Sequence, residues 1–433
     1  MQDEEFRRRL KTAIFIFLCF SAFMGFHLGA IDLILSNYFK EAYNATAQQR
    51  GLIEIPRELP GIVSLFVITA FSFLRDIRSA VIAQAFGVAG LTVLGVFHPS
   101  FGVMMIFIFI YSLGMHMSLP LSDSIGLSLA TRETMGRVLG RFKSVNTAFG
   151  MIAGVICFAG FRAGFFNFDT PVLVFLLGAL AFLVCGVLLM AMHGQIGREI
   201  ESRTDVSKLV FRKEYARYYV ICALYGSRKQ IMFAFSPWVL IELLGFKADT
   251  MSILGVIGSF IGIFFILFVG KLIDKKGSRF TMIIEAGCFI ALYIAYGLLC
   301  KMLSGQSVVI AGINLFFIYA LFVIDRTTMH FHMVRAVYMK TIAVKPEDVT
   351  PSLSTGLAID HVFAIISAFL CGIVWDAWGP EYVFIIAAIL SFANMLAAYG
   401  IRKDAVVDRL AGGEGGEGGK NGEEKGGKKG GKK

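Results

Sequence analysis

Long apolar runs alternate with short polar clusters along the chain from Ile14 to Ile401. A helix needs about 20 mostly apolar residues to cross the hydrocarbon core of a bilayer, and only helices and closed barrels satisfy their backbone groups there. The runs are too long and too continuous for the alternating pattern of a barrel strand. The pattern therefore predicts an all-α membrane protein.

Division of the chain at its polar clusters gives twelve predicted spans. They cover residues 13–38, 51–74, 79–97, 101–123, 138–161, 170–193, 217–243, 251–272, 280–301, 308–335, 352–375 and 381–401. The widest internal gap follows the sixth span, so we expect two bundles of six helices. The predicted domains are an N-terminal bundle at 1–193, a cytoplasmic interdomain loop at 194–216, a C-terminal bundle at 217–401 and a disordered, glycine-rich cytoplasmic tail at 402–433.

The orientation follows from the Lys and Arg residues of the short loops. With the N-terminus inside, most of them are cytoplasmic, and the outer loops hold only Lys40, Arg50, Arg162, Lys247 and Lys301. This asymmetry predicts that both termini are cytoplasmic and that the protein lies in the plasma membrane, the inner membrane of a bacterium. It also explains most of the net charge of +10, which therefore gives no reason to expect nucleic acid as a partner.

The two halves repeat each other weakly. Aligning Gly25 of the first span with Gly226 of the seventh also places Ala47 opposite Ala248 at the start of the next span. The fourth span contains IYSL and the tenth contains IYAL. A six-helix duplication with both termini on one side is the arrangement of parallel repeats, related by an axis along the membrane normal.

The loop after the eighth span reads GKLIDKKGSRF. It resembles the G-x-x-x-D-[RK]-x-G-[RK]-[RK] signature of the major facilitator superfamily (MFS), with Ser278 as the one departure. The matching residues are Gly270, Asp274, Gly277 and Arg279. The corresponding first-half loop, SFLRDIRSA, keeps Asp76 and Arg78 but has Ser72 and Ser79 where glycines would stand.

This resemblance implies a twelve-helix secondary transporter in which the motif stabilises one of two access states. It also implies that the first, fourth, seventh and tenth helices line a central cavity. In that family the first-half copy of the motif is usually the better one. The reversal in this chain leaves open which half carries the stronger gate.

Ionisable residues concentrate in a few spans, although a charge at the bilayer centre costs about 2.5–3.5 kcal/mol on insertion scales. Such groups normally face a protein interior or an aqueous cavity. The candidates for substrate binding are His27, Arg57, His116, Arg228, Lys229, Asp325, Arg326 and His330. Three have a structural alternative: Arg57 can pair with Glu54, Asp325 can neutralise Arg228 or Lys229, and His116 can be a hydrogen-bonded core residue.

The candidates for proton coupling are Asp32, Asp360 and His361. A carboxylate beside an imidazole can titrate near neutral pH when both are desolvated, which favours Asp360 with His361. The arginines and the lysine of the substrate set favour a small molecule with an anionic group. We therefore expect a monomeric, proton-coupled transporter of an organic anion or amphiphile.

Three other functions fit the sequence less well. A drug/proton antiporter is less favoured because GMIAG at 150–154 lacks the following proline of the antiporter signature. A ferroportin-like exporter of divalent metals could use His27, Asp32, Asp360 and His361, since imidazole and carboxylate suit such ions. A non-transporting membrane sensor would not need so many cavity charges.

We expect no enzyme, because no HExxH or GxSxG motif and no paired-aspartate active-site motif is recognised in a span. The seven cysteines form no CxxC pair, so we expect no structural metal site and no cofactor.

Overall fold

The computed structural model describes residues 2–71, 74–130, 134–196, 211–304 and 315–401, and the regular structure within them is entirely helical. The predictions for most of the interdomain loop, for the tail and for Ser72 fall outside these residues. The domain boundaries therefore stay predictions.

The first half consists of helices that match its six predicted spans. They are α1 (Gln2–Asp32), α2 (Leu35–Tyr43), α3 (Ala47–Ala70), α4 (Asp76–Val96), α5 (Phe101–Ser128), α6 (Met135–Arg162) and α7 (Leu173–Ile196). Helices α1 and α2 share the first predicted span, which is interrupted at Leu33 and Ile34.

The second half has more interruptions. Its elements are η1 (Lys213–Tyr215), α8 (Ala216–Trp238), the π-helical η2 (Val239–Leu243), α9 (Ala248–Ser304), α10 (Leu315–Thr328), η4 (Met329–His332), α11 (Met333–Ile342), η5 (Pro346–Asp348), α12 (Val349–Trp378) and α13 (Pro380–Tyr399). Helix α9 contains two predicted spans, joined at Gly277, whose φ of 77° falls in the region that favours glycine. The predicted fold of two bundles and twelve spans is confirmed.

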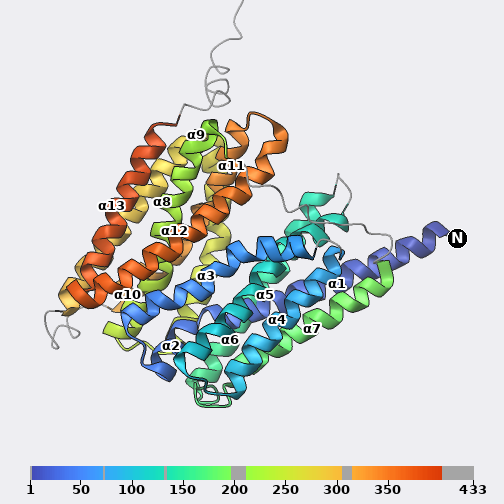
Figure 1. The fold of residues 1–433 in the computed structure, drawn as a ribbon, viewed down its shortest axis with the longest axis horizontal. Helices are drawn as coiled ribbons and strands as arrows, with labels where there is room; N and C mark the ends of the chain where they lie inside the picture. The colour runs from blue at the N-terminus through green and yellow to red at the C-terminus, as the bar shows by residue number, and fades with distance from the viewer. Residues whose placement is uncertain (1, 72–73, 131–133, 197–210, 305–314, 402–433) are drawn as a thin grey trace, which may run out of the picture.

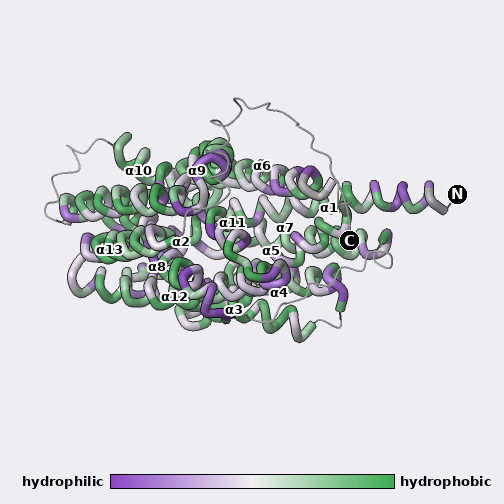
Figure 2. Tube along the Cα trace, turned by 90° about the horizontal axis from the view of Figure 1, so that it is seen from above, coloured by the Kyte–Doolittle hydropathy of each residue, from purple (hydrophilic) through white to green (hydrophobic). Residues whose placement is uncertain are grey.

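Eight helices of the described residues are long and apolar enough to cross a membrane. Large apolar side chains cover the outside of the molecule; Phe264, Leu267 and Ile389 are each at least 60% exposed. Figure 2 shows apolar colouring along most helices and a polar start of α1. An exposed apolar surface of this extent suits lipid and not water.

The internal repeat appears in the packing of equivalent helix pairs. Helix α1 packs along α6, and α8 packs along α12. A Cβ atom on Gly25 would lie 1.9 Å from the carbonyl oxygen of Asn146 in α6, and one on Gly226 would lie 2.3 Å from that of Asp360 in α12. The two glycines aligned in the sequence therefore serve the same purpose, which is close approach of two helices.

The two halves meet along α3 with α12 and along α6 with α9. We call the end that holds the α2–α3 and α12–α13 connections the closed end. There a Cβ on Gly51 would lie 2.3 Å from the carbonyl oxygen of Ala368, and one on Gly372 would lie 2.7 Å from that of Ala47. Polar contacts also join the halves at this end, including the ion pair of Lys40 in α2 with Glu242 in η2 at 2.5 Å.

The opposite end, where α1 begins and α13 ends, is called the terminal end, and the bundles diverge toward it (Figure 1). One cavity at this end is lined by α1, α5 and α6 of the first half. Another, of about 320 Å³, is lined by α8, η4, α11 and α12 of the second half. Each of these two linings comes from one half.

Candidate functional site

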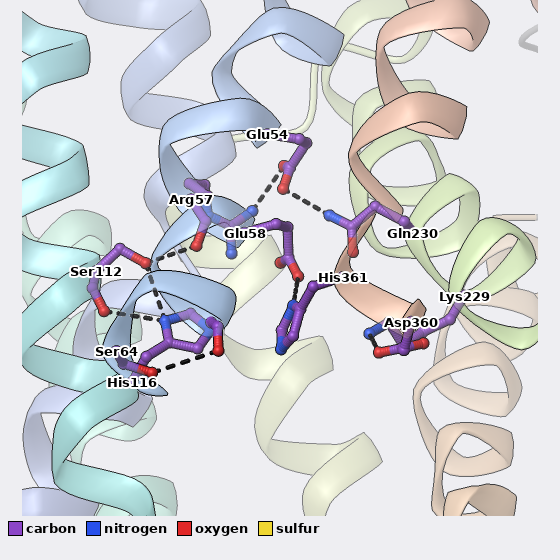
Figure 3. Close-up of polar contacts among 11 residues, drawn as sticks. Glu54, Arg57, Glu58, Ser64, Ser112, His116, Lys229, Gln230, Asp360 and His361 are labelled. Atoms are coloured by element: carbon purple, nitrogen blue, oxygen red, sulfur yellow. Dashed lines mark hydrogen bonds and ion pairs between the residues drawn. The ribbon is translucent and has the colours of Figure 1, made fainter. Parts of the chain in front are cut away.

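Glu54 is the centre of a charge cluster between the halves (Figure 3). It lies on α3, fully buried, with Arg50 and Arg57 on the same helix face. Both arginines form ion pairs with its Oε1 atom, Arg57 at 2.7 Å. The Nε2 atom of Gln230, in α8 of the other half, donates to Oε2 at 2.5 Å. Glu54 thus neutralises cations of its own helix and also joins the two halves.

Glu58 forms a second contact between the halves, one turn further along α3. Its Oε2 atom lies 2.8 Å from Nδ1 of His361, which α12 supplies. Gly61 leaves space for this imidazole, since a Cβ there would lie 2.4 Å from its Nε2 atom. The ring of His116 from α5 packs edge-on against the ring of His361, with 5.4 Å between centroids. A carboxylate and two imidazoles from three helices are therefore in contact at the interface.

Asp360 precedes His361 in the sequence but has a different partner. Lys229 of α8 donates to its Oδ2 atom at 2.7 Å, so this ion pair lies within the second half (Figure 3). Neighbouring side chains on a helix point about 100° apart. The structure therefore places Asp360 and His361, two of the three predicted proton-coupling residues, in different pairs.

A cavity of about 220 Å³ lies between the halves, next to Glu54. Its charged and imidazole lining residues are Asp32, Arg50, Arg57, Arg326 and His330. The guanidinium of Arg326 lies 5.1 Å from the ring centroid of Phe233 and 4.9 Å from that of Phe322. Arg57 approaches the same Phe233 ring at 5.2 Å. The cavity thus combines cations with an aromatic wall, and it collects four of the predicted site residues: Asp32, Arg57, Arg326 and His330.

The other five predicted substrate residues lie outside this lining: His116 and Lys229 belong to the contacts described above, and three lie inside their own bundles. Arg228 is fully buried in the second half, where its Nη2 atom lies 2.6 Å from Glu285. Asp325 is buried as well and accepts a hydrogen bond from Ser236 at 2.8 Å. His27 stacks on Phe182 inside the first half, with 3.8 Å between ring centroids. Each lies on the bundle side of its helix, away from the lining of the shared cavity.

The motif residues of the two halves are in different surroundings. Asp274 is exposed, nothing lies within 4 Å of a Cβ on Gly270, and Arg279 packs over the ring of Tyr399 at 6.0 Å. In the first half, Asp76 is buried and accepts a hydrogen bond from Ser124 at 2.5 Å, while Arg78 lies 3.3 Å from His193. In this conformation the first-half copy of the motif makes closer polar contacts than the second-half copy does.

The predicted site residues did not include Glu58, which pairs with His361, or two further buried charges whose signals were present in the sequence. Arg50 was assigned to a loop, yet it precedes Glu54 by four residues and Arg57 by seven, which is one face of a helix. Glu285 stands alone in the apolar run TMIIEAGCFIAL, a position that requires a cationic partner. The partner, Arg228, is 57 residues away in the chain, so its identity required the structure.

The chain belongs to the Major Facilitator Superfamily, whose sequence model matches residues 12–344. The protein is an integral membrane transporter of this family. No curated protein matches it in sequence.

Solved structures with the same fold include the nucleoside transporter NupG, with 14% identity, a TM-score of 0.69 and coverage of 90% of this chain and 100% of that one. A POT family transporter in complex with 5-aminolevulinic acid shows 12% identity, a TM-score of 0.71 and coverage of 89% and 95%. A D-xylose–proton symporter shows 13% identity, a TM-score of 0.67 and coverage of 91% and 98%. At these identities the similarity concerns the fold alone.

Proposed function

We propose that this protein is a proton-coupled secondary transporter that moves a small solute with an anionic group by alternating access. The observation that carries the proposal is the contact of Glu58 with His361, because it joins the two halves through a pair that can bind a proton. It lies beside a cavity that presents Arg57 and Arg326 to a bound anion. If both termini are cytoplasmic, the closed end faces outward and the conformation described here faces the cytoplasm.

Proton binding can bias this conformation through the strength of one contact. With one proton the pair is a carboxylate and an imidazolium, so the attraction between two opposite charges adds to their hydrogen bond. Without that proton the imidazole is neutral, and only its hydrogen bond to the carboxylate remains. Loss of that proton weakens the contact between α3 and α12. The proton therefore favours the state in which these helices meet, and a ligand shifts such an equilibrium only through its differential affinity for the two states.

Other charged groups face this pair. Arg57 from α3 and Lys229 from α8 are cations near Glu58, and His116 from α5 lies against His361. In this proposal His361 has the coupling role predicted from the sequence, with Glu58 as its partner. Asp360, which is paired with Lys229, and Asp32, in the cavity, are second candidates.

We expect Glu58→Gln and His361→Gln to retain exchange of substrate across the membrane but to lose its acceleration by a pH gradient. Gln cannot carry the proton, while its size keeps the helix contact. The measurement uses proteoliposomes that contain the dye pyranine, with uptake of lactate, benzoate, succinate and alanine compared at equal and unequal pH. Asp123→Asn is the control, since Asp123 is exposed and pairs with Lys143 within the first half.

Full pH-driven uptake by both variants would assign the proton to another carboxylate. Asp360→Asn and Asp32→Asn would then identify which one.

A further inference from the structure

The cavity between the halves contains a cation, Arg326, that forms no ion pair with an acidic side chain of the described residues. Among the residues that the structure describes, no carboxylate lies within 4.0 Å of Arg326, which instead packs against two phenylalanine rings. Arg50 and Arg57, in contrast, are both paired with Glu54. Arg326 is half-buried and lines the cavity from the second half. Its guanidinium is therefore the group available to a carboxylate of the substrate.

The same cavity contains a carboxylate side chain that forms no ion pair with a cation of the described residues. Asp32 is exposed in the cavity, and no Lys, Arg or His of the described chain lies within 4.0 Å of its carboxylate. It is also the last residue of α1, at the end of the helix where the carbonyl groups create negative potential. An acidic residue there is unfavourable unless a cation binds nearby. The interruption of the first span thus creates a site for a positive group.

Contacts between the halves hold this interruption in position. Leu33 follows Asp32 and projects toward α9, where a Cβ on Gly255 would lie 2.1 Å from its Cδ2 atom. Glycine at this position lets the break in the first span approach the second half. Discontinuous helices of transporters present their ends to charged substrates in the same manner.

We infer that the substrate is amphoteric, a small molecule with both a carboxylate and an ammonium group, bound with its carboxylate at Arg326 and its ammonium at Asp32. This inference deepens the proposed function and rests on it. Arg57 and Arg326 act on Asp32 electrostatically but form no ion pair with it within 4.0 Å. A simple anion at Arg326 would therefore leave Asp32 without an ion pair and near a second negative charge, and a simple amine at Asp32 would leave Arg326 without one. A molecule with both groups can pair with Asp32 of the first half and Arg326 of the second half at once. Its binding then favours the state in which the halves approach each other.

The test is a matched binding panel with purified full-length protein. It contains the standard amino acids and β-alanine, together with the deaminated and the decarboxylated counterpart of each, for example alanine, propionate and ethylamine. Bound compounds raise the melting temperature of the folded state. We expect stabilisation by at least one amphoteric compound and by neither of its counterparts.

Two variants separate the two contacts. Asp32→Asn and Arg326→Gln should each weaken binding of the amphoteric compound by at least roughly tenfold, the usual range for loss of one member of a desolvated pair. Asp32→Asn should in addition accept the carboxylate counterpart, and Arg326→Gln the amine. Asp123→Asn is the control, because Asp123 lies outside this cavity and pairs with Lys143 within the first half. It should bind like the natural protein.

Two results would overturn the inference. One is that no amphoteric compound binds. The other is that a carboxylate counterpart binds the natural protein as well as the amphoteric compound does and is unaffected by Asp32→Asn. In the second case pH-driven uptake of that carboxylate would leave the proposed function intact. Binders whose movement never responds to a pH gradient would instead contradict the proposed function.

Discussion

Glu54→Gln is expected to destabilise the folded protein by about 3–5 kcal/mol, because it leaves two buried arginines without their shared counter-charge. Arg50 is 1% exposed and Glu54 is fully buried, so water cannot replace the lost interaction. The variant also weakens the contact with Gln230 of the other half. The measurement is thermal unfolding in detergent at fixed pH and salt.

Two controls define the cause of that loss. Glu41→Gln removes an exposed ion pair with Lys247 between the same two halves, at 3.7 Å, and should cost about 0–1 kcal/mol. Glu285→Gln removes an equally buried acid that pairs with Arg228 and Arg335 inside the second half, so it should destabilise without loosening the interface. If Glu54→Gln melted like Glu41→Gln, the buried cluster would have no structural importance.

Gly51→Leu is expected to prevent the conformation described here. A Cβ on Gly51 would lie 2.3 Å from the carbonyl oxygen of Ala368, and a backbone atom in a helix cannot move aside as a side chain can. Helices α3 and α12 would then have to separate at the closed end. The population should shift to a state that is open there, and transport should be lost, since alternating access requires both states.

Spin labels at Ala163 and Ala377 would report this separation, because both are exposed at the closed end and they belong to different halves. We expect an increase in their distance in Gly51→Leu, measured by pulsed electron resonance. Gly102→Leu is the matched control: Gly102 lies at the same end in α5, and nothing is within 4 Å of a Cβ there. An unchanged distance in Gly51→Leu, with normal uptake, would contradict the proposed packing requirement.

The fold could be predicted from the sequence because the membrane imposes a simple rule. Apolar runs of sufficient length must be helices. Their number, together with the wide gap after the sixth run, predicted two bundles of six helices. The two interrupted spans were not predicted. The break after Asp32 and the short η4 helix lie in segments whose apolar pattern continues, so a count of apolar residues contains no sign of them.

The site could be predicted only as a set of residues, without their partners. Unusual charges within apolar runs identified Arg57, Arg326 and His361, which do lie at the interface or in the cavity. Pairing depends on which helices meet: Glu58 and His361 are 303 residues apart in the chain. Arg228 was a candidate for substrate binding like Arg326, but it lies in the interior of its own bundle, where it pairs with Glu285.

The most direct test of proton coupling through Glu58 and His361 needs no substrate. The distance between spin labels at Ala163 and Ala377 is measured in the reconstituted protein over a range of pH, in the natural sequence, in Glu58→Gln and in His361→Gln. The coupling predicts that lower pH increases the population with the closed end shut, and that both variants lose this dependence. The same pH dependence in all three proteins would contradict it.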